Sequence, residues 1–307
     1  MKHSFKMDMD QYARPQQLVP VGRHRRLNLL VMGQAMPTVV LAAGYLGGTL
    51  DWGLVQPYVA RSAQVVSFDT PGLGFSDPTA GRRTSTAIVR DLRIALAAAD
   101  IAPPYVLVGH SAGGLRMHLF AATHPDEVAG LVMVDSVTAD FDRRAPGTSR
   151  AMAGERAIFR RMLGKARAGT LTPEDPDYIA RVGLPRAGLS PAVNQALHEM
   201  WTRPSYLSTA IREGLGLASP DAGEIEADRR PLGDLPLVVL SAARRAHDSF
   251  IDREADTRAW LQMHDEIAAL SSRGIRRTVD CGHNIPVEHP RAVVEAIEQV
   301  LAVVRET

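Results

Sequence analysis

The stretch that decides the fold is residues 106–114, which read Val-Leu-Val-Gly-His-Ser-Ala-Gly-Gly. An apolar run typical of a buried strand enters a Gly-x-Ser-x-Gly turn, and a helix-forming segment follows at residues 115–122. In such a bend the serine lies at the tip, because side chains larger than a hydrogen atom would clash at the flanking glycines. The hydroxyl of Ser111 would then lie beside a helix N-terminus, whose free N–H groups favour developing negative charge. The pattern predicts a nucleophilic serine; the alternative is a serine that only caps the helix.

The composition excludes several classes of partner. The chain has 307 residues, 45% of them hydrophobic and 22% charged, and a formal net charge of +1. A chain of this length buries about three quarters of the surface that it exposes when unfolded, so it can form one large α/β domain with or without an insertion. The balanced charge indicates no attraction to nucleic acid or to an anionic membrane. The single cysteine, Cys281, excludes an internal disulfide and a cysteine cluster for zinc.

The sequence shows no pattern typical of a membrane-spanning segment or of a secretory signal. No apolar run approaches the roughly 18 residues needed to span a bilayer. Residues 1–10 are polar and charged and lack the apolar segment of a secretory signal. We therefore expect a soluble, cytoplasmic protein.

Strand-like and helix-like segments alternate along most of the chain. Apolar strand patterns occur at residues 18–21, 27–32, 38–42, 64–68, 105–108, 130–134, 237–240 and 275–279. This alternation predicts an α/β fold with a doubly wound, mostly parallel eight-stranded sheet. Between residues 139 and 230 the strand patterns vanish, and Pro, Gly and Arg punctuate short helical pieces. We predict a core at residues 17–138 and 231–307, an inserted helical cap at residues 139–230, and a loosely ordered leader at residues 1–16.

A serine needs a base to remove its proton, and the base is usually histidine. Ten histidines are present, so position must select among them. His283 lies in a glycine-containing loop between the last strand and the last helix, where the carboxyl ends of parallel strands place ligand-binding groups. His289 precedes a proline at a helix start, a common capping arrangement, and His110 should point into the fold. We therefore predict that His283 is the base.

With these features the chain resembles the α/β-hydrolase-fold proteins that carry a helical cap, over nearly all of residues 18–305. The resemblance rests on the serine turn, on the loop at residues 69–76 (Asp-Thr-Pro-Gly-Leu-Gly-Phe-Ser) and on Gly282-His283. It implies an acyl-enzyme mechanism: Ser111 attacks a carbonyl carbon, His283 transfers the proton, and water releases the acid. It also implies an oxyanion hole formed by the backbone N–H groups of Tyr45 and Ala112.

The sequence departs from the family pattern after the third strand. A His-Gly pair is common there, whereas this chain has Ala43-Gly44. The histidine is not an oxyanion donor, so we expect the hole to survive and its loop to be held in another way.

The acid that supports His283 has more than one candidate. The usual place follows the strand at residues 237–240, but an arginine of the Arg244-Arg245 pair occupies that slot and Asp248 comes about three residues late. The other place known in the family is the end of the preceding strand, where Asp135 stands. We favour Asp135, with Asp248 as the alternative and Asp280 or another carboxylate as a further one. The acid must hold the imidazole tautomer and stabilise the imidazolium.

These residues predict a serine esterase that needs no cofactor or metal and hydrolyses a carboxylic ester or lactone of modest size. The histidines are dispersed, and the glycine loops lack the phosphate-binding signature. A serine at this turn argues against dehalogenase and epoxide hydrolase chemistry, for which the family uses aspartate. The same residues also suit hydrolysis of a carbon–carbon bond in a dione, a hydroxynitrile-lyase-like reaction, or a receptor that binds a ligand with little turnover.

The pocket for the substrate has only weak candidates in the sequence. Trp52, Trp201, Tyr206 and the methionines of the cap could line an acyl pocket, although such residues in short helices more often belong to a core.

Overall fold

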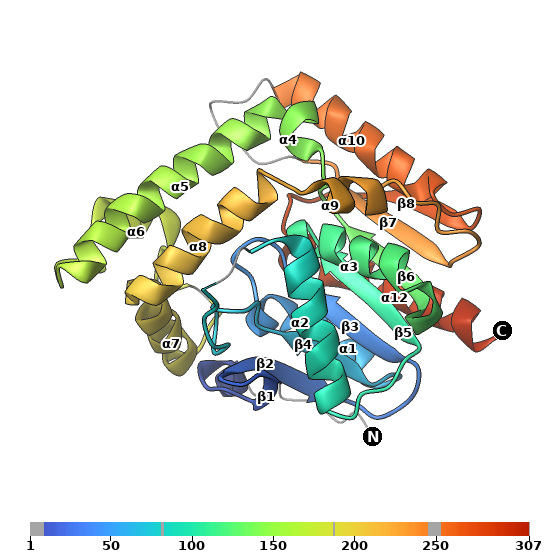
Figure 1. Cartoon of the computed structure of the whole chain (residues 1–307), viewed down its shortest axis with the longest axis horizontal. Helices are drawn as coiled ribbons and strands as arrows, with labels where there is room; N and C mark the ends of the chain where they lie inside the picture. The colour runs from blue at the N-terminus through green and yellow to red at the C-terminus, as the bar shows by residue number, and fades with distance from the viewer. Residues whose placement is uncertain (1–8, 81–82, 187, 245–252, 307) are drawn as a thin grey trace.

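The backbone forms one sheet with helices on both faces (Figure 1). The computed structural model describes residues 9–80, 83–186, 188–244 and 253–306. Within these residues the sheet has eight strands in the order β1-β2-β4-β3-β5-β6-β7-β8. β2 is antiparallel to β1 and β4, and the pairs from β4 through β3 to β8 are parallel. The predicted mostly parallel eight-stranded sheet is confirmed. The strands are β1 (Gln17–Gly22), β2 (Arg25–Met32), β3 (Thr38–Ala42), β4 (Val65–Phe68), β5 (Tyr105–His110), β6 (Val128–Val134), β7 (Leu237–Ala242) and β8 (Gly274–Val279).

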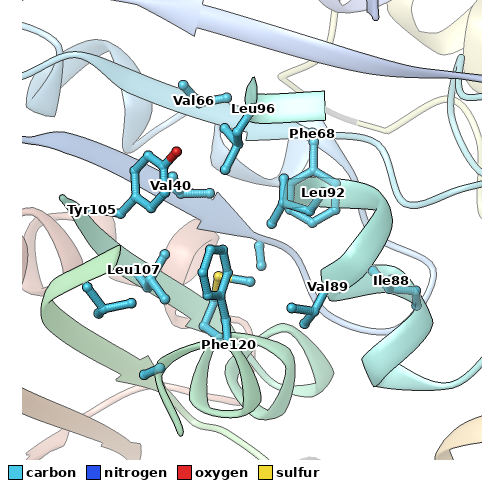
Figure 2. Packing of buried hydrophobic residues seen from close by; sticks show 14 of the residues in the cluster. Val40, Val66, Phe68, Ile88, Val89, Leu92, Leu96, Tyr105, Leu107 and Phe120 are labelled. Atoms are coloured by element: carbon cyan, nitrogen blue, oxygen red, sulfur yellow. The ribbon is translucent and has the colours of Figure 1, made fainter. Parts of the chain in front are cut away.

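The two faces of the sheet bury separate apolar clusters. On β3, Val40 belongs to the cluster under α2 (Ser85–Ala98) and α3 (Ala112–Thr123), whereas its neighbour Val39 belongs to the cluster under α12 (Pro290–Arg305). Successive side chains of a strand point to opposite faces, so each strand contributes to both clusters. Figure 2 shows the first cluster, in which leucines of α2 meet Phe120 and the strand valines. Burying each of these larger side chains contributes about 1.5–3 kcal/mol.

The remaining helices of the core are short or lie near the C-terminus. They are η1 (Met9–Ala13), η2 (Thr49–Trp52), α1 (Gln56–Val59), η3 (Pro125–Glu127), α10 (Arg253–Ala269) and α11 (Ile285–Glu288). Among the described residues, no helix combines the length and the apolar character needed to cross a membrane.

The carboxyl ends of the central strands lie level with one another. Ala42 at the end of β3 pairs with Gly109 of β5, and His110 pairs with Val134 at the end of β6. Further along the sheet, Ala242 at the end of β7 pairs with Val279 at the end of β8. Each of these strands therefore delivers its next residues to the same edge of the sheet.

A helical insertion separates β6 from β7, in the region where the sequence predicts a cap. It has its own apolar cluster, which includes Phe159, Trp201 and Leu207, and α5 and α8 lie side by side in it (Figure 1). Its helices are α4 (Phe141–Arg144), α5 (Pro146–Arg167), α6 (Pro176–Arg181), α7 (Pro191–Thr202), α8 (Pro204–Leu217) and α9 (Ala222–Ala227).

The segment predicted to be a loose leader is partly packed. η1 lies within it, and Tyr12 on this turn is only 3% exposed. The Tyr12 ring belongs to a cluster with Leu30 of β2 and Val193 of α7. The expectation of a loosely ordered leader is therefore wrong for residues 9–13, because an aromatic side chain bridges the sheet and the insertion.

Asp69 fixes the loop that follows β4. Its Oδ1 accepts a hydrogen bond from Thr49 N–H (2.9 Å), and its Oδ2 accepts from Asn28 Nδ2 (2.8 Å) and Phe75 N–H (3.0 Å). Burial raises the pKa of Asp69, and these donors oppose the rise. The carboxylate thus ties the Pro/Gly-rich loop to β2 and to η2.

A buried ionic cluster joins the insertion to the core. Arg116 of α3 donates from Nη2 to Glu213 Oε1 of α8, and Arg83 Nη2 lies 3.7 Å from Glu213 Oε2. The three side chains are at most 1% exposed. Two guanidinium groups therefore share one carboxylate, and burial lowers the pKa of Arg83 to about 10. Such a cluster depends on its single anion, because an unpaired buried charge is costly.

We predict that Glu213→Gln lowers the free energy of unfolding by about 3–5 kcal/mol, because it removes the carboxylate with which both buried guanidinium groups pair. Urea titration followed by circular dichroism measures the change. The matched control is Glu295→Gln, which removes the 55% exposed partner of Arg291 and should change stability by less than ~1 kcal/mol. Equal effects of the two variants would contradict the assignment.

Candidate active site

Ser111 lies at a strained turn between β5 and α3. Its backbone angles are φ 54° and ψ −121°, and a positive φ is unfavourable for any residue with a Cβ. Its N–H donates to Val134 O of β6 (2.9 Å). Ser111 is the N-cap residue of α3, but its side chain makes no capping hydrogen bond. The alternative of a serine that only caps the helix is therefore not what the geometry supports.

The turn requires glycine, because the backbones of α3 and of the loop after β3 come too close to β3 and Ser111 for a side chain to fit. A Cβ added to Gly113 would lie 2.1 Å from Ala42 O of β3, so α3 could not approach the sheet with any other residue there. A Cβ added to Gly44 would lie 3.1 Å from Ser111 Cβ. The loop after β3 therefore runs directly beside the serine.

This contact brings both predicted oxyanion donors to Ser111. Ala112 is the first residue of α3, and Tyr45 follows Gly44. Neither N–H donates a hydrogen bond to another group within the described part of the chain. Both donors are therefore available to an anionic oxygen near Ser111.

The insertion and α3 hold the loop after β3, where this chain lacks the family's histidine. Tyr45 Oη donates to Ala210 O of α8 (2.8 Å), and its ring contacts Phe159 of α5. Arg116 of α3 donates from Nη1 to Ala43 O (3.4 Å). Burial raises the pKa of Tyr45, which keeps this hydroxyl a donor. The structure thus agrees with the expectation that the loop is held in another way.

His283 follows β8 and contacts Asp135, which follows β6. Its Nδ1–H donates to Asp135 Oδ2 at 2.6 Å. The imidazole is 31% exposed, whereas the carboxylate is fully buried. Donation from Nδ1 leaves the lone pair on Nε2, the tautomer that a general base requires. The structure therefore brings together His283 and the favoured acid candidate.

The other oxygen of Asp135 has donors that the sequence did not reveal. Oδ1 accepts from Ala242 N–H at the end of β7 (2.9 Å) and from Trp260 Nε1–H of α10 (3.1 Å). A fully buried carboxylate is tolerated only when such donors replace water. Both are set by tertiary placement, so the sequence pattern carries no signal for them.

The alternative acids have different surroundings. Asp280 is 87% exposed and pairs with Arg244 (3.3 Å), so the structure does not bring it to His283. Asp248 lies outside the described residues. The other histidine near the loop, His289, is an exposed N-cap residue of α12.

His110 supports the His283 loop from beneath. Its side chain is 8% exposed, as expected for a residue pointing into the fold. Its Nε2–H donates to His283 O at 2.9 Å, and the two ring centroids are 4.7 Å apart. Burial, and to a smaller extent the nearby His283, lowers the pKa of His110 to about 3. The residue beside Ser111 therefore contacts the histidine loop as a neutral imidazole.

A cavity of about 230 Å³ opens beside this site. Tyr45 of the proposed oxyanion loop and Asn284, which follows His283, form part of its wall, as do Trp201 and Tyr206 of the insertion. Ser111 and His283 themselves do not line it. Trp52, a further candidate, is fully buried against the sheet and does not line the cavity.

Comparison with known proteins agrees with the fold. The profile of a family described as alpha/beta hydrolase fold matches residues 37–182. The uncharacterized protein YqjL of Bacillus subtilis is 24% identical over 269 residues, which cover 87% of this chain and 85% of that protein.

Solved structures show the same fold at low sequence identity. A Pseudomonas aeruginosa protein provisionally assigned as an epoxide hydrolase superposes with a TM-score of 0.67 at 21% identity, covering 95% of this chain and 99% of that one. An esterase from Thermogutta terrifontis superposes with a TM-score of 0.64 at 20% identity, with the same coverage of both chains.

We predict that the low pKa of His110 makes stability depend on pH. Unfolded histidine binds a proton near pH 6.5, whereas folded His110 does so only near pH 3. The unfolded state therefore binds the extra proton between these values, and stability falls as pH falls, by ~2 kcal/mol between pH 7 and pH 5.

Urea unfolding of the wild type and of His110→Gln across this range measures the effect. The variant keeps a side-chain N–H donor but cannot titrate, so its stability should fall less steeply with decreasing pH. The same replacement at the exposed His289 is the control. Parallel curves for wild type and His110→Gln would show that His110 is not held neutral.

Proposed function

Because this chain belongs to the α/β-hydrolase superfamily, we propose that it is a serine hydrolase that cleaves a carboxylic ester or lactone through an acyl-enzyme on Ser111. One observation carries the proposal. The 2.6 Å hydrogen bond between His283 and the buried Asp135 lies at the strand edge that also holds the Ser111 turn. A nucleophile, a base and an acid on adjoining strand ends are what acyl transfer requires.

The reaction would proceed in two steps. Ser111 Oγ attacks the carbonyl carbon while His283 Nε2 takes its proton, and Asp135 stabilises the imidazolium that forms. The oxyanion accepts hydrogen bonds from Tyr45 and Ala112 N–H, and the proton then passes to the leaving alcohol oxygen. Water activated by His283 attacks the acyl carbon in the second step and releases the acid and Ser111.

The cavity supports a substrate of modest size. Its wall combines apolar side chains of α7 and α8, including Met200 and Trp201, with the charged Arg181 and Asp51. About 230 Å³ is somewhat less than the volume of pockets that typically bind drug-sized ligands. We therefore propose short acyl or alkyl groups rather than long lipid chains.

We predict that wild type hydrolyses short p-nitrophenyl esters faster than long ones and that Ser111→Ala loses at least about 10⁴-fold in kcat. A fluorophosphonate probe should label wild type but not the variant. Ser62→Ala is the matched control. Ser62 lies outside the Ser111 turn and donates a hydrogen bond to Glu298, so this variant should retain activity and labelling.

The outcomes of this assay separate the alternatives. Labelling of Ser111 without ester turnover would support the carbon–carbon hydrolase or lyase reading of the same residues. Absence of both labelling and turnover would contradict the hydrolase proposal and leave the receptor reading.

We predict that Asp135→Asn lowers kcat by about 10³–10⁴-fold, because an amide cannot stabilise the imidazolium and selects the wrong tautomer. Asp248→Asn should change kcat less than about threefold. Steady-state kinetics on the best ester of the panel measures both. A large loss in Asp248→Asn with little change in Asp135→Asn would reverse the assignment.

A further inference from the structure

Trp260 contacts both members of the proposed acid–base pair. It lies on α10, is 1% exposed, and donates from Nε1 to Asp135 Oδ1 at 3.1 Å. Its ring also meets the imidazole of His283 edge to face, with centroids 6.1 Å apart and an angle of 77° between the planes.

The indole N–H determines how the carboxylate of Asp135 is oriented. Ala242 N–H and Trp260 Nε1–H both donate to Oδ1, and two donors on one oxygen restrict rotation of the carboxylate more than one donor does. With Oδ1 held, Oδ2 is directed at His283 Nδ1. Two donors on Oδ1 also stabilise the ionised form of a carboxylate that has no contact with water.

Hydrogen bonds of His264 fix α10 to the residues next to Asp135 and next to Ala242. His264, one turn after Trp260, donates from Nε2 to Ser136 O (2.9 Å) and accepts at Nδ1 from Ser241 Oγ (2.7 Å). Ser136 follows Asp135, and Ser241 precedes Ala242. The helix is thus docked on the ends of β6 and β7, which agrees with its place beside β7 and β8 in Figure 1.

We propose that Trp260 is a positioning residue that orients Asp135 and, through it and by direct ring contact, the imidazole of His283. The proposal rests on the proposed function for its kinetic consequences, although the contacts themselves do not. Trp260 does not line the cavity, so it should influence the chemical step rather than substrate binding.

Several titratable groups lie near the hydrogen bond between Trp260 and Asp135 and affect how a pH profile is interpreted. Among the described residues they include His283, His264 with Nδ1 at 4.0 Å from Asp135 Oδ1, and the more distant His110 and Cys281, whose pKa values the charge of Asp135 acts to raise. Trp260 also contacts the ring of His264, with centroids 5.7 Å apart. A shift in the pH profile of a Trp260 variant therefore reports on the groups that the indole contacts, which are Asp135, His283 and His264.

The test is Trp260→Phe, which keeps an aromatic ring and removes the N–H donor. Loss of the indole N–H leaves Oδ1 with one donor fewer and makes the Asp135 carboxylate a stronger hydrogen-bond acceptor toward His283. We expect kcat to fall about tenfold, KM to stay within twofold, and the acidic limb of the kcat/KM profile to move up by about half a pH unit or more.

The matched control is Trp52→Phe. Trp52 is also fully buried, and its Nε1 has no hydrogen-bond partner among the described residues. This change should leave the acidic limb in place and kcat within twofold. A folded Trp260→Phe enzyme with wild-type kcat and an unmoved acidic limb would overturn the proposal.

A second measurement needs neither activity nor a folded Trp260 variant. The chain has three tryptophans, so the indole N–H signals of ¹⁵N-labelled wild type can be assigned by elimination with Trp52→Phe and Trp201→Phe. We expect the Trp260 signal to exchange slowly with solvent and to shift in Asp135→Asn, which changes the group that accepts its hydrogen bond. Rapid exchange, or no shift in that variant, would overturn the proposal even if ester hydrolysis is absent.

Discussion

The backbone contact at the Ser111 turn is the constraint on which the rest of the site depends. The helix α3 approaches the sheet so closely that Gly113 leaves no room for a Cβ beside Ala42 O. This approach holds Ser111 at a positive φ and leads its N–H to Val134 O, the carbonyl just before Asp135. The ends of β3, β5 and β6 are thereby locked to one another, and the groups that follow them meet without further adjustment. Strain at the serine is tolerated because three strands and a helix determine its position together.

Hydrogen bonds connect the insertion to the loop after β3 and to α3, next to the Ser111 turn. Tyr45, next to Gly44, donates to Ala210 O of α8, and Arg116 bonds both Ala43 O and Glu213 of the same helix. The loop that carries a proposed oxyanion donor is therefore held from above by α8 and from below by α3. A displacement of α8 would move Tyr45, so the insertion can influence the geometry of catalysis as well as the shape of the cavity.

The sequence predicts the parts of this molecule that depend on local pattern and chain order. Apolar periodicity locates the eight strands, and the rule that parallel strands expose their carboxyl ends at one edge favours Ser111 and His283 among many serines and histidines. The choice of Asp135 over Asp248 comes from the resemblance to the α/β-hydrolase family. The sequence does not predict which side chains surround these residues. The hydrogen bonds from Trp260 to Asp135 and from His110 to His283 depend on how α10 and the last loop dock. Tyr12 was missed for the same reason, because its burial comes from α7, which lies far along the chain.

The central claim is a covalent intermediate on Ser111, and rapid-quench mass spectrometry tests it most directly. The protein is mixed with an excess of a short p-nitrophenyl ester and quenched with acid within milliseconds to seconds. Mass spectrometry then gives the mass of the intact protein and of its proteolytic peptides. The account predicts one added acyl group, located on the peptide that contains Ser111, together with a burst of p-nitrophenol of matching size if deacylation limits turnover. Asp135→Asn should slow deacylation. For a given rate of turnover, a larger fraction of this variant than of the wild type should therefore carry the acyl group when the reaction is quenched. Ester hydrolysis with no acyl group on Ser111 in either protein, or with the group on another residue, would contradict the account.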